Sequence, residues 1–462
     1  MTPKAKRILK KSLIISVCTL ILLLLISAVG AMYLLTTAAG QQKAKEFVVG
    51  MLSKELQTEI RLDSISINVR NGNIDLFGFA IKDLQGVEML SVESVEVGID
   101  FRRLFSKEIA LHKAVITGAN GVFYKAHPDS AANFQFALDR LKSKRKAKVQ
   151  AKKEFKFIPN LERAEIIRSS LKWDVMSGDT VAIGTLSPDH IHIKDFGTKI
   201  KINLQDTVVT YAEISEMKIR EENSGAEITL GSLAYDATAT DSTQLRLSGL
   251  SGKLLTNVVG IQGLDVTASK ENFKRLSNLD VKLTNLAFHT NNSPHRINFN
   301  RPHHGAFDAK HLNLGANAAI TIKSIRHDSI DAKLRHMELL DTGSQLKITN
   351  LSCDIAHRKE ATKVTNFSVS MENTTVNIPE CNIQHKGSDI VFGETKVTGK
   401  TLLKDIHKPF APILRTFTTP LALRVTAGGP IDKLKFRDIV VNTLDNRLRI
   451  TAEGLFTDIT KK

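Results

Sequence analysis

Residues 60–124 read IRLDSISINVRNGNIDLFGFAIKDLQGVEMLSVESVEVGIDFRRLFSKEIALHKAVITGANGVFY, and they contain the clearest structural pattern of the chain. Apolar and polar residues alternate in it, and this period of two gives a β-strand one apolar and one polar face. The alternating apolar positions are Ile65, Ile67 and Val69 in one run, and Val95, Val97, Ile99 and Phe101 in another. The stretch therefore predicts long, half-buried strands.

Short motifs follow one another in a fixed order within this stretch. A strand ends in Asp83-Leu84-Gln85-Gly86, and residues 90–95 (LSVESV) come next. An Arg-Leu corner at Arg103-Leu104 precedes residues 109–118 (IALHKAVITG), and a variable piece then ends at Asn133. In this order the motifs resemble the N-terminal region of the AsmA-like family, which includes the TamB-type translocation and assembly proteins. The resemblance is strongest over residues 60–135, within a predicted AsmA-like N-terminal β region at residues 60–138.

The AsmA-like resemblance carries an expectation for the whole fold. It implies a mainly β chain in which a single N-terminal transmembrane helix precedes an elongated, curved β-sheet with a few short helices. In that family the sheet is thought to form a groove, or taco-like trough, whose apolar side holds lipid acyl chains. We therefore expect residues 157–462 to continue the sheet as an extended groove.

Charge is concentrated in two segments of this 462-residue chain, whose formal net charge is +16. One segment is the basic head at residues 1–12. The other is residues 139–156, a basic linker or helix with nine basic and two acidic residues. The rest of the chain is close to neutral, which argues against nucleic acid as a partner because such binding needs a basic face on a folded domain. The basic linker is either solvated or in contact with lipid headgroups.

An apolar segment follows the basic head. Residues 13–35 contain no charged side chain and would span roughly 35 Å as a helix, enough to cross a hydrocarbon core. We predict a transmembrane anchor at residues 13–36, and its anchoring residues include Leu13, Leu20, Leu25 and Leu35. The upstream cations place the N-terminus in the cytoplasm and the bulk of the chain in the periplasm. The alternative is a cleaved signal peptide, although its apolar region would be shorter.

Residues 41–58 have the apolar spacing of an amphipathic helix. The positions that carry this pattern are Ala44, Phe47, Val48, Met51, Leu52 and Leu56. Such a helix would either cap the first strands or lie along the membrane surface. We favour the capping helix.

A short cassette recurs in the second half of the chain. Its copies are Leu247-Ser248-Gly249-Leu250-Ser251, Leu283-Thr284-Asn285-Leu286-Ala287, Ile348-Thr349-Asn350-Leu351-Ser352 and Val364-Thr365-Asn366-Phe367-Ser368. The apolar residues in each copy are three positions apart rather than two, so a strand that keeps both on one face needs an extra residue, which is a β-bulge. We also predict one helix near residues 401–417.

Two interpretations remain open for the apolar face of these strands. Periodicity alone favours a sandwich in which two sheets pack on each other, whereas the resemblance favours an open face that contacts lipid. The candidate lipid-facing residues are Val95, Val97, Ile99, Leu279, Val281, Leu283, Leu346, Ile348, Leu421, Leu423 and Val425.

Chemical motifs are scarce. Cys353 and His357, and likewise Cys381 and His385, are four residues apart and invite a zinc interpretation. On strands, however, each pair would be about 13 Å apart, so we expect no metal site. The two cysteines either form a disulfide or stay unpaired. Glu221 and its neighbour look like hairpin-loop charges, and we identify no catalytic or cofactor-binding residue.

Two functional hypotheses follow from the anchor, the sheet and the resemblance. The first is an inner-membrane-anchored, single-pass periplasmic protein that shields or transfers phospholipid between the inner and outer membranes and so supports outer-membrane biogenesis. The second is a scaffold that assists assembly or translocation of outer-membrane or secreted proteins by β-strand pairing with a barrel or barrel-assembly partner. Neither hypothesis makes the protein an enzyme.

Overall fold

The computed structural model describes most of the chain after the predicted anchor. The described residues are 36–104, 106, 108–140, 156–176, 184–205, 208–254, 256–290, 307, 311–386, 389–410 and 412–457. They are mainly β, with 23 strands and a few helices, as predicted. Residues 13–35 lie outside the described part. Within that part, no helix combines the length and the apolar composition needed to cross a bilayer.

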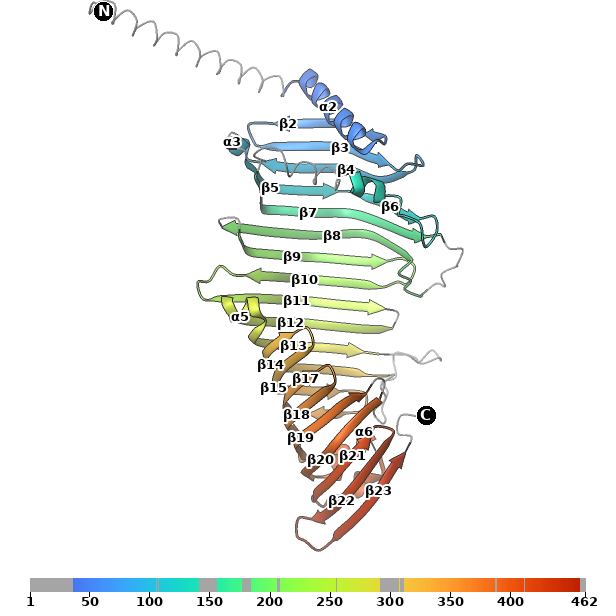
Figure 1. Ribbon diagram of the computed structural model, residues 1–462, viewed down its shortest axis with the longest axis vertical. Coiled ribbons are helices and arrows are strands. Elements are labelled where there is room, and N and C mark those ends of the chain that lie inside the picture. The colour runs from blue at the N-terminus through green and yellow to red at the C-terminus, as the bar shows by residue number, and fades with distance from the viewer. Residues whose placement is uncertain are drawn as a thin grey trace, which may run out of the picture. The chain divides into compact units, whose positions relative to one another are not determined.

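The described residues divide into two compact units, and Figure 1 labels the strands of both. The first unit runs to Val208 and also includes Ile219–Ser224. The second unit contains Val209–Lys218 and the described residues from Gly225 onward. Each unit is built around its own run of strands.

The first unit contains a mixed sheet. Its strands are β1 (Ile60–Arg61), β2 (Ser64–Asn68), β3 (Asn73–Lys82), β4 (Glu88–Ile99), β5 (Glu108–Thr117), β6 (Asn120–Lys125), β7 (Lys156–Val175) and β8 (His190–Gln205). The first six pair in antiparallel fashion, and β1 and β2 both pair with β3. The next strand, β7, is parallel to β5 and β6 and antiparallel to β8. The parallel pairing requires a crossover between β6 and β7, which period-two alternation could not reveal.

The second unit contains an antiparallel meander. Its strands are the Val209–Lys218 part of β9 (Val208–Glu221), β10 (Glu227–Asp236), β11 (Ser242–Leu254), β12 (Asn257–Ser269), β13 (Ser277–His289), β14 (Asn313–Arg326), β15 (Ser329–Asp341), β16 (Leu346–Ile348), β17 (Asn350–Arg358), β18 (Ala361–Ser370), β19 (Thr375–Lys386), β20 (Asp389–Thr401), β21 (Leu421–Pro430), β22 (Lys433–Thr443) and β23 (Arg449–Thr457). From β10 onward each strand pairs with the next, except that β16 and β17 both pair with β15. The meander places residues that are near in sequence side by side.

The predicted amphipathic helix is α2, Ala38–Leu56. Thr37 caps its N-terminus, because its hydroxyl accepts a hydrogen bond of 3.2 Å from the Gly40 N–H. One side of α2 contacts β1 and β2, and Leu56 is buried there. The other side leaves Phe47 70% and Met51 47% exposed. The helix therefore lies against the first strands, as we favoured, and also carries an uncovered apolar pair.

The cassettes are sites of backbone irregularity, as their spacing predicts. Gly249, Asn285 and Asn366 all have positive φ, between 48° and 65°, a conformation that glycine and asparagine tolerate better than other residues. The register shifts between Leu283 and Leu286, which face Ala318 and Ala316 on β14. Both leucines therefore stay on one face of the sheet. In the remaining copy, residues 348–352, the strand is instead interrupted between β16 and β17.

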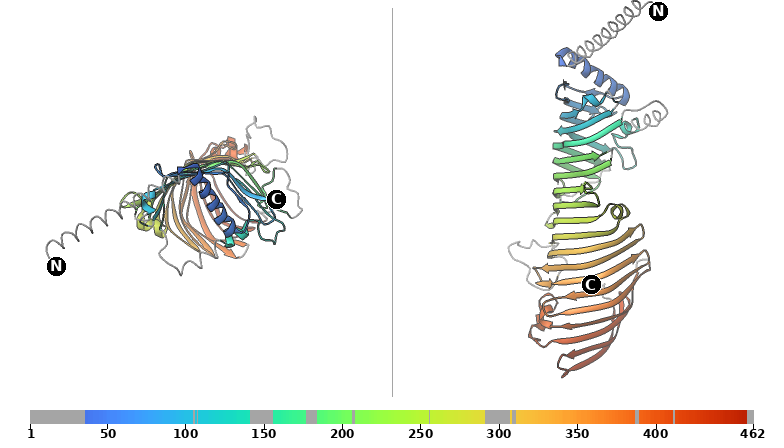
Figure 2. Two further views of the ribbon diagram at one scale, coloured as in Figure 1. Left: turned by 90° about the horizontal axis from the view of Figure 1, so that it is seen from above. Right: turned by 90° about the vertical axis from the view of Figure 1, so that its left-hand side faces the viewer.

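Neither unit is a sandwich. Within each unit the described strands form one sheet, and no second sheet of described strands packs against it. The sandwich interpretation is therefore wrong for the described residues. In both views of Figure 2 the strands coloured yellow to red, all in the second unit, are bent along their length, and β-bulges are a known source of such bending.

Candidate functional site

The first unit carries a continuous apolar surface, here called the first apolar face. Directly paired residues in neighbouring strands share a face, so the register traces the surface across the sheet. One row is Ile65, Leu76, Val95, Ile116 and Ile166, and the next is Ile67, Ile74, Val97, Ala114, Ala164 and Ile200. The predicted residues Val95, Val97 and Ile99 belong to this face and are half-buried.

The second unit carries the second apolar face, which the register again traces strand by strand. One row is Tyr235, Leu245, Val266, Val281, Ile320, Leu334 and Cys353. Another is Leu351, Val369, Val376, Gly399, Leu423, Val441 and Ile450. Leu351 and Cys353 are two residues apart on β17, so both rows lie on one side of the sheet.

The remaining predicted residues fall on the same face. Leu279 and Leu283 flank Val281 at spacing two, as Leu421 and Val425 flank Leu423. Ile348 pairs with Leu339, and Leu339 pairs with Ala316 on β14. Ala316 lies on the same face of β14 as Ile320, and Leu346 is two residues from Ile348, so both predicted residues share the second apolar face. The structure thus brings together the second-unit residues that alternation selected.

The reverse side of the second sheet is charged. Its ion pairs include Arg335 with Asp280 at 3.2 Å, Lys323 with Asp354 at 3.4 Å, and Lys363 with Glu380 at 3.0 Å. Such exposed ion pairs contribute little to stability, but their charged groups favour contact of this side of the sheet with water. One face of this sheet is therefore apolar and the opposite face is charged.

A short helix covers one margin of the second apolar face. This helix is α5, Lys270–Arg275, and the ring of its Phe273 lies 6.0 Å from the ring of Tyr235. Leu279 and Val281 beside it are only 5% and 9% exposed, whereas Leu283 further along β13 is half-buried. Since α5 is a single short helix, it shelters the margin of the face and leaves the middle open.

A second helix covers the face near its C-terminal end. This helix is α6, Leu403–Phe410, followed by the 3-10 helix η1, Pro412–Thr416, in the region where we predicted a helix. An apolar pocket of about 320 Å³ lies beneath α6. Its lining residues are Val369, Met371, Thr374, Val376, Thr401, Leu403, Ile406, Leu421, Leu423 and Val441.

The carboxylate of Asp405 ties α6 to the turn between β18 and β19. It accepts hydrogen bonds from the backbone N–H of Asn373 at 2.7 Å, from the Asn373 amide at 3.1 Å and from the Thr374 hydroxyl at 2.9 Å. Charge-assisted hydrogen bonds of this kind are strong. They hold the helix over the pocket, and the Thr374 hydroxyl, which belongs to the pocket lining, is satisfied by Asp405.

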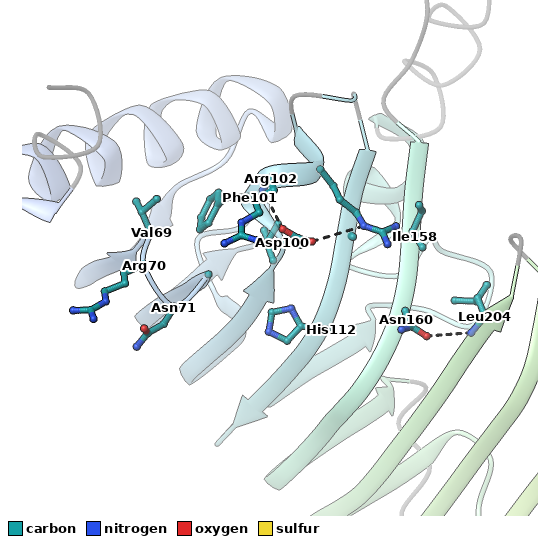
Figure 3. Close-up of a pocket in the computed structure, with 14 residues that line it drawn as sticks. Val69, Arg70, Asn71, Asp100, Phe101, Arg102, His112, Ile158, Asn160 and Leu204 are labelled. Atoms are coloured by element: carbon teal, nitrogen blue, oxygen red, sulfur yellow. Dashed lines mark hydrogen bonds and ion pairs between the residues drawn. The ribbon is translucent and has the colours of Figure 1, made fainter. Parts of the chain in front are cut away.

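A different kind of pocket lies at strand ends of the first unit, and we call it the basic pocket (Figure 3). It has a volume of about 510 Å³, and its lining residues are Val69, Arg70, Asn71, Gly72, Ile99, Asp100, Phe101, Arg102, Arg103, Ala110, His112, Ile158, Asn160 and Leu204. These residues come from the β2–β3 turn, the corner after β4 that contains α3 (Phe101–Leu104), and the ends of β5, β7 and β8. Sequence reasoning noted the Arg-Leu corner but missed the pocket.

The backbone holds the walls of the basic pocket in place. The N–H of Ile99 donates to the Gly72 carbonyl at 2.7 Å, and the N–H of Asp100 donates to the Ala110 carbonyl at 3.0 Å. Gly72 has a φ of +72°, and a Cβ there would lie 2.4 Å from the Ile99 carbonyl oxygen. Only glycine fits this close approach of the two turns.

Two residues of the family-like motifs, Asp83 and Asn133, meet in the first unit. Both are buried, and the Asp83 carboxylate accepts hydrogen bonds from the Asn133 amide at 3.3 Å and the Tyr124 hydroxyl at 2.9 Å. The N–H groups of Gln85 and Val87 donate to it at 2.9 Å each. Burial by itself would raise the pKa of Asp83, but these hydrogen bonds outweigh it and lower the pKa below its ordinary value. The cluster closes a turn and is structural.

Glu221 has the same structural role as Asp83. It lies at the end of β9 beside the hairpin turn, as we predicted, but it is buried rather than solvated. Its carboxylate accepts hydrogen bonds from the N–H groups of His192 at 3.1 Å and Asn223 at 3.0 Å. Burial opposes the charge and would raise the pKa of Glu221, but hydrogen bonds, chiefly from Ser224, keep the pKa below its ordinary value.

The two Cys-His pairs lie on β17 and β19, which are separated by β18. Both cysteines are free, with Cys353 on β17 and Cys381 on β19. Because β18 runs between these strands, the cysteines are about 10 Å apart or more, too far for a disulfide. The rings of His357 and His385 do approach, with centroids 5.9 Å apart. Among the described residues, no group of three or more side chains is arranged to hold a metal ion.

Comparisons with known proteins add no assignment. No protein-family model matches the sequence, and no curated protein matches it. The two apolar faces and the pockets beside them are therefore the features from which function can be inferred.

Proposed function

We propose that this protein is a single-pass inner-membrane protein that shields or transfers phospholipid between the inner and outer membranes, in support of outer-membrane biogenesis. Residues 13–36 are the anchor in this proposal, the N-terminus is cytoplasmic and the strands lie in the periplasm. The observation that carries the proposal is the second apolar face, whose rows continue from β10 to β23 with no second sheet of described strands on top.

An open apolar face suits this task energetically. Exposing an acyl chain to water costs about 0.8 kcal/mol per methylene, on the order of 10 kcal/mol for a whole chain. A face of aliphatic side chains removes that cost at each position along it. The task breaks no covalent bond, so we propose that the protein works without catalysis and without a cofactor.

The margins of the second face support the same proposal. The pocket beneath α6 is apolar and has room for part of a hydrocarbon chain. Soluble proteins seldom leave large contiguous apolar patches exposed unless the patches contact a ligand, a partner or a membrane. Hydrocarbon is the ligand that needs such a surface and no directed polar group.

The edge of β23 favours a second candidate function, the strand-pairing scaffold. Leu448, Ile450, Leu455 and Phe456, in and beside this strand, are all about half exposed. In the described part of the chain no strand pairs with the outer edge of β23. An exposed apolar edge is a template for an added strand, so crosslinks from β23 to an outer-membrane or barrel-assembly partner would favour this role.

The proposed function is tested by the lipid that stays with the protein. We expect full-length protein, extracted from membranes in a mild detergent, to retain at least about one phospholipid molecule per chain. Mass spectrometry would measure this amount. A single-pass membrane protein with a small polar periplasmic domain, purified in parallel, gives the background. Phospholipid no higher than that background would contradict the proposal and leave the scaffold.

A further inference from the structure

We propose that the basic pocket binds the phosphate group of an anionic amphiphile, whose hydrocarbon lies on the first apolar face. The location of the hydrocarbon rests on the proposed function. The phosphate contact rests on the pocket itself.

The lining of the basic pocket has an excess of positive groups. The lining contains three arginines, Arg70, Arg102 and Arg103, and a single carboxylate, that of Asp100. Arg103 is paired with that carboxylate at 3.8 Å and with Glu108 at 3.6 Å. In the part of the chain that the structure describes, no acidic side chain forms an ion pair with Arg70 or Arg102. Two guanidinium groups are thus available to an anion, and guanidinium groups match phosphate oxygens in geometry and charge.

The two available arginines are held by fixed turns. The N–H of Arg102 donates to the Asp100 carboxylate at 3.0 Å, and the N–H of Asn71 donates to the Asn68 side chain at 3.1 Å. The bond between Ile99 and Gly72 joins the two turns. Figure 3 shows Arg70 and Asn71 on one turn and Arg102 on the other, with the ring of His112 between the turns and β7. Preorganised turns of this kind lower the entropic cost of binding.

The basic pocket opens onto the first apolar face. Ile99 belongs to both, since it lines the pocket and lies two residues from Val97 on β4. Val69, Ile158 and Leu204 add further apolar lining. A phosphate held by Arg70 and Arg102 would therefore place its attached chain on Val97 and Val95. An anionic amphiphile requires cationic groups next to an aliphatic surface, and the basic pocket and the first apolar face provide both. Free phosphate requires only the cationic groups.

The test compares two probes on full-length protein in a neutral detergent, with binding measured by isothermal titration calorimetry. The probes are dihexanoylphosphatidylglycerol and inorganic phosphate. The double variant Arg70→Gln/Arg102→Gln removes the available guanidinium groups. The control Arg326→Gln/Arg424→Gln removes the same charge from two exposed arginines of the second unit, neither of which forms an ion pair with an acidic side chain of the described residues. Arg70→Lys/Arg102→Lys keeps the charge without the planar fork.

We expect the wild type to bind dihexanoylphosphatidylglycerol at least tenfold more tightly than inorganic phosphate. We expect the Gln pair to weaken that binding about tenfold or more, the Lys pair to restore part of it, and the control pair to stay within about twofold. Unchanged binding in the Gln pair would overturn the proposal. Equal affinity for inorganic phosphate would overturn the amphiphile assignment.

Total phospholipid that co-purifies with the same proteins separates this inference from the proposed function. We expect its amount per chain to be similar in the Gln pair and its anionic fraction to fall. A wild type that binds the short-chain probe but retains no native phospholipid would support the basic pocket and contradict the proposed function.

Discussion

Replacing Ile320 by aspartate is expected to remove most of the phospholipid that co-purifies with the full-length chain. Ile320 lies on β14 in the middle of the second apolar face, between Val281 and Leu334, and it is half-buried. A carboxylate there keeps its water shell and forces hydrocarbon away from the face. Losing contact with about three methylenes, at about 0.8 kcal/mol each, would weaken retention roughly 50-fold.

The matched control for this variant is the preceding residue. Ala319 faces the opposite side of the sheet, beside Lys282 and His336, so Ala319→Asp adds the same charge to a polar surface. We expect Ala319→Asp to retain phospholipid at the wild-type level. Circular dichroism shows whether both variants keep their strands. Equal lipid content in two folded variants would contradict a lipid role for this face.

Replacing Asp83 by alanine is expected to destabilise the first unit by about 3 kcal/mol, roughly a 150-fold change in its folding equilibrium. The variant leaves the buried Asn133 amide, the Tyr124 hydroxyl and two backbone N–H groups without their acceptor. Trp173 is the only tryptophan of the chain, and its ring lies 6.4 Å from that of Phe134, next to Asn133. Its fluorescence during urea denaturation therefore reports on this unit.

The pH dependence of stability gives a second check on Asp83. Its pKa is lower in the folded protein than its ordinary value of 3.8, so its contribution is fully present above that value and is lost as the pH falls through the folded pKa. We expect the difference between wild type and Asp83→Ala to shrink below about pH 4. Asp129→Ala is the control, because that side chain is 96% exposed. A pH-independent difference would show that the charge of Asp83 is not what stabilises the turn.

Local chemistry made the strands and their irregularities predictable. Alternation at Val281 and Leu423 selected side chains that do share one face. Spacing of three located the bulge between Leu283 and Leu286, where Asn285 has a positive φ that asparagine tolerates better than most residues. These features depend on a residue and its immediate neighbours, so the sequence contains enough to predict them.

Contacts between distant turns could not be predicted in the same way. Asp83 and Asn133 are 50 residues apart. They meet because Asn133 is hydrogen-bonded to β6, and β6 pairs with β4 next to the turn that carries Asp83. The two turns that carry Arg70 and Arg102 come together because Gly72 admits the Ile99 carbonyl. Strand order and register determine such contacts between distant residues, and apolar alternation specifies neither of them. The sandwich interpretation arose for the same reason. Alternation shows that one face of a strand is apolar, but it does not show whether a second sheet or a hydrocarbon ligand would cover that face.

Photo-crosslinking on the second apolar face tests whether phospholipid lies against it. Benzoylphenylalanine would replace Leu283, which faces the apolar side, and in a separate variant Lys282, which faces the charged side. After irradiation in native membranes, mass spectrometry would detect phospholipid joined to the full-length chain. We predict phospholipid adducts at position 283 and none above background at 282. Adducts at neither position, or equally at both, would contradict the claim that this face holds lipid.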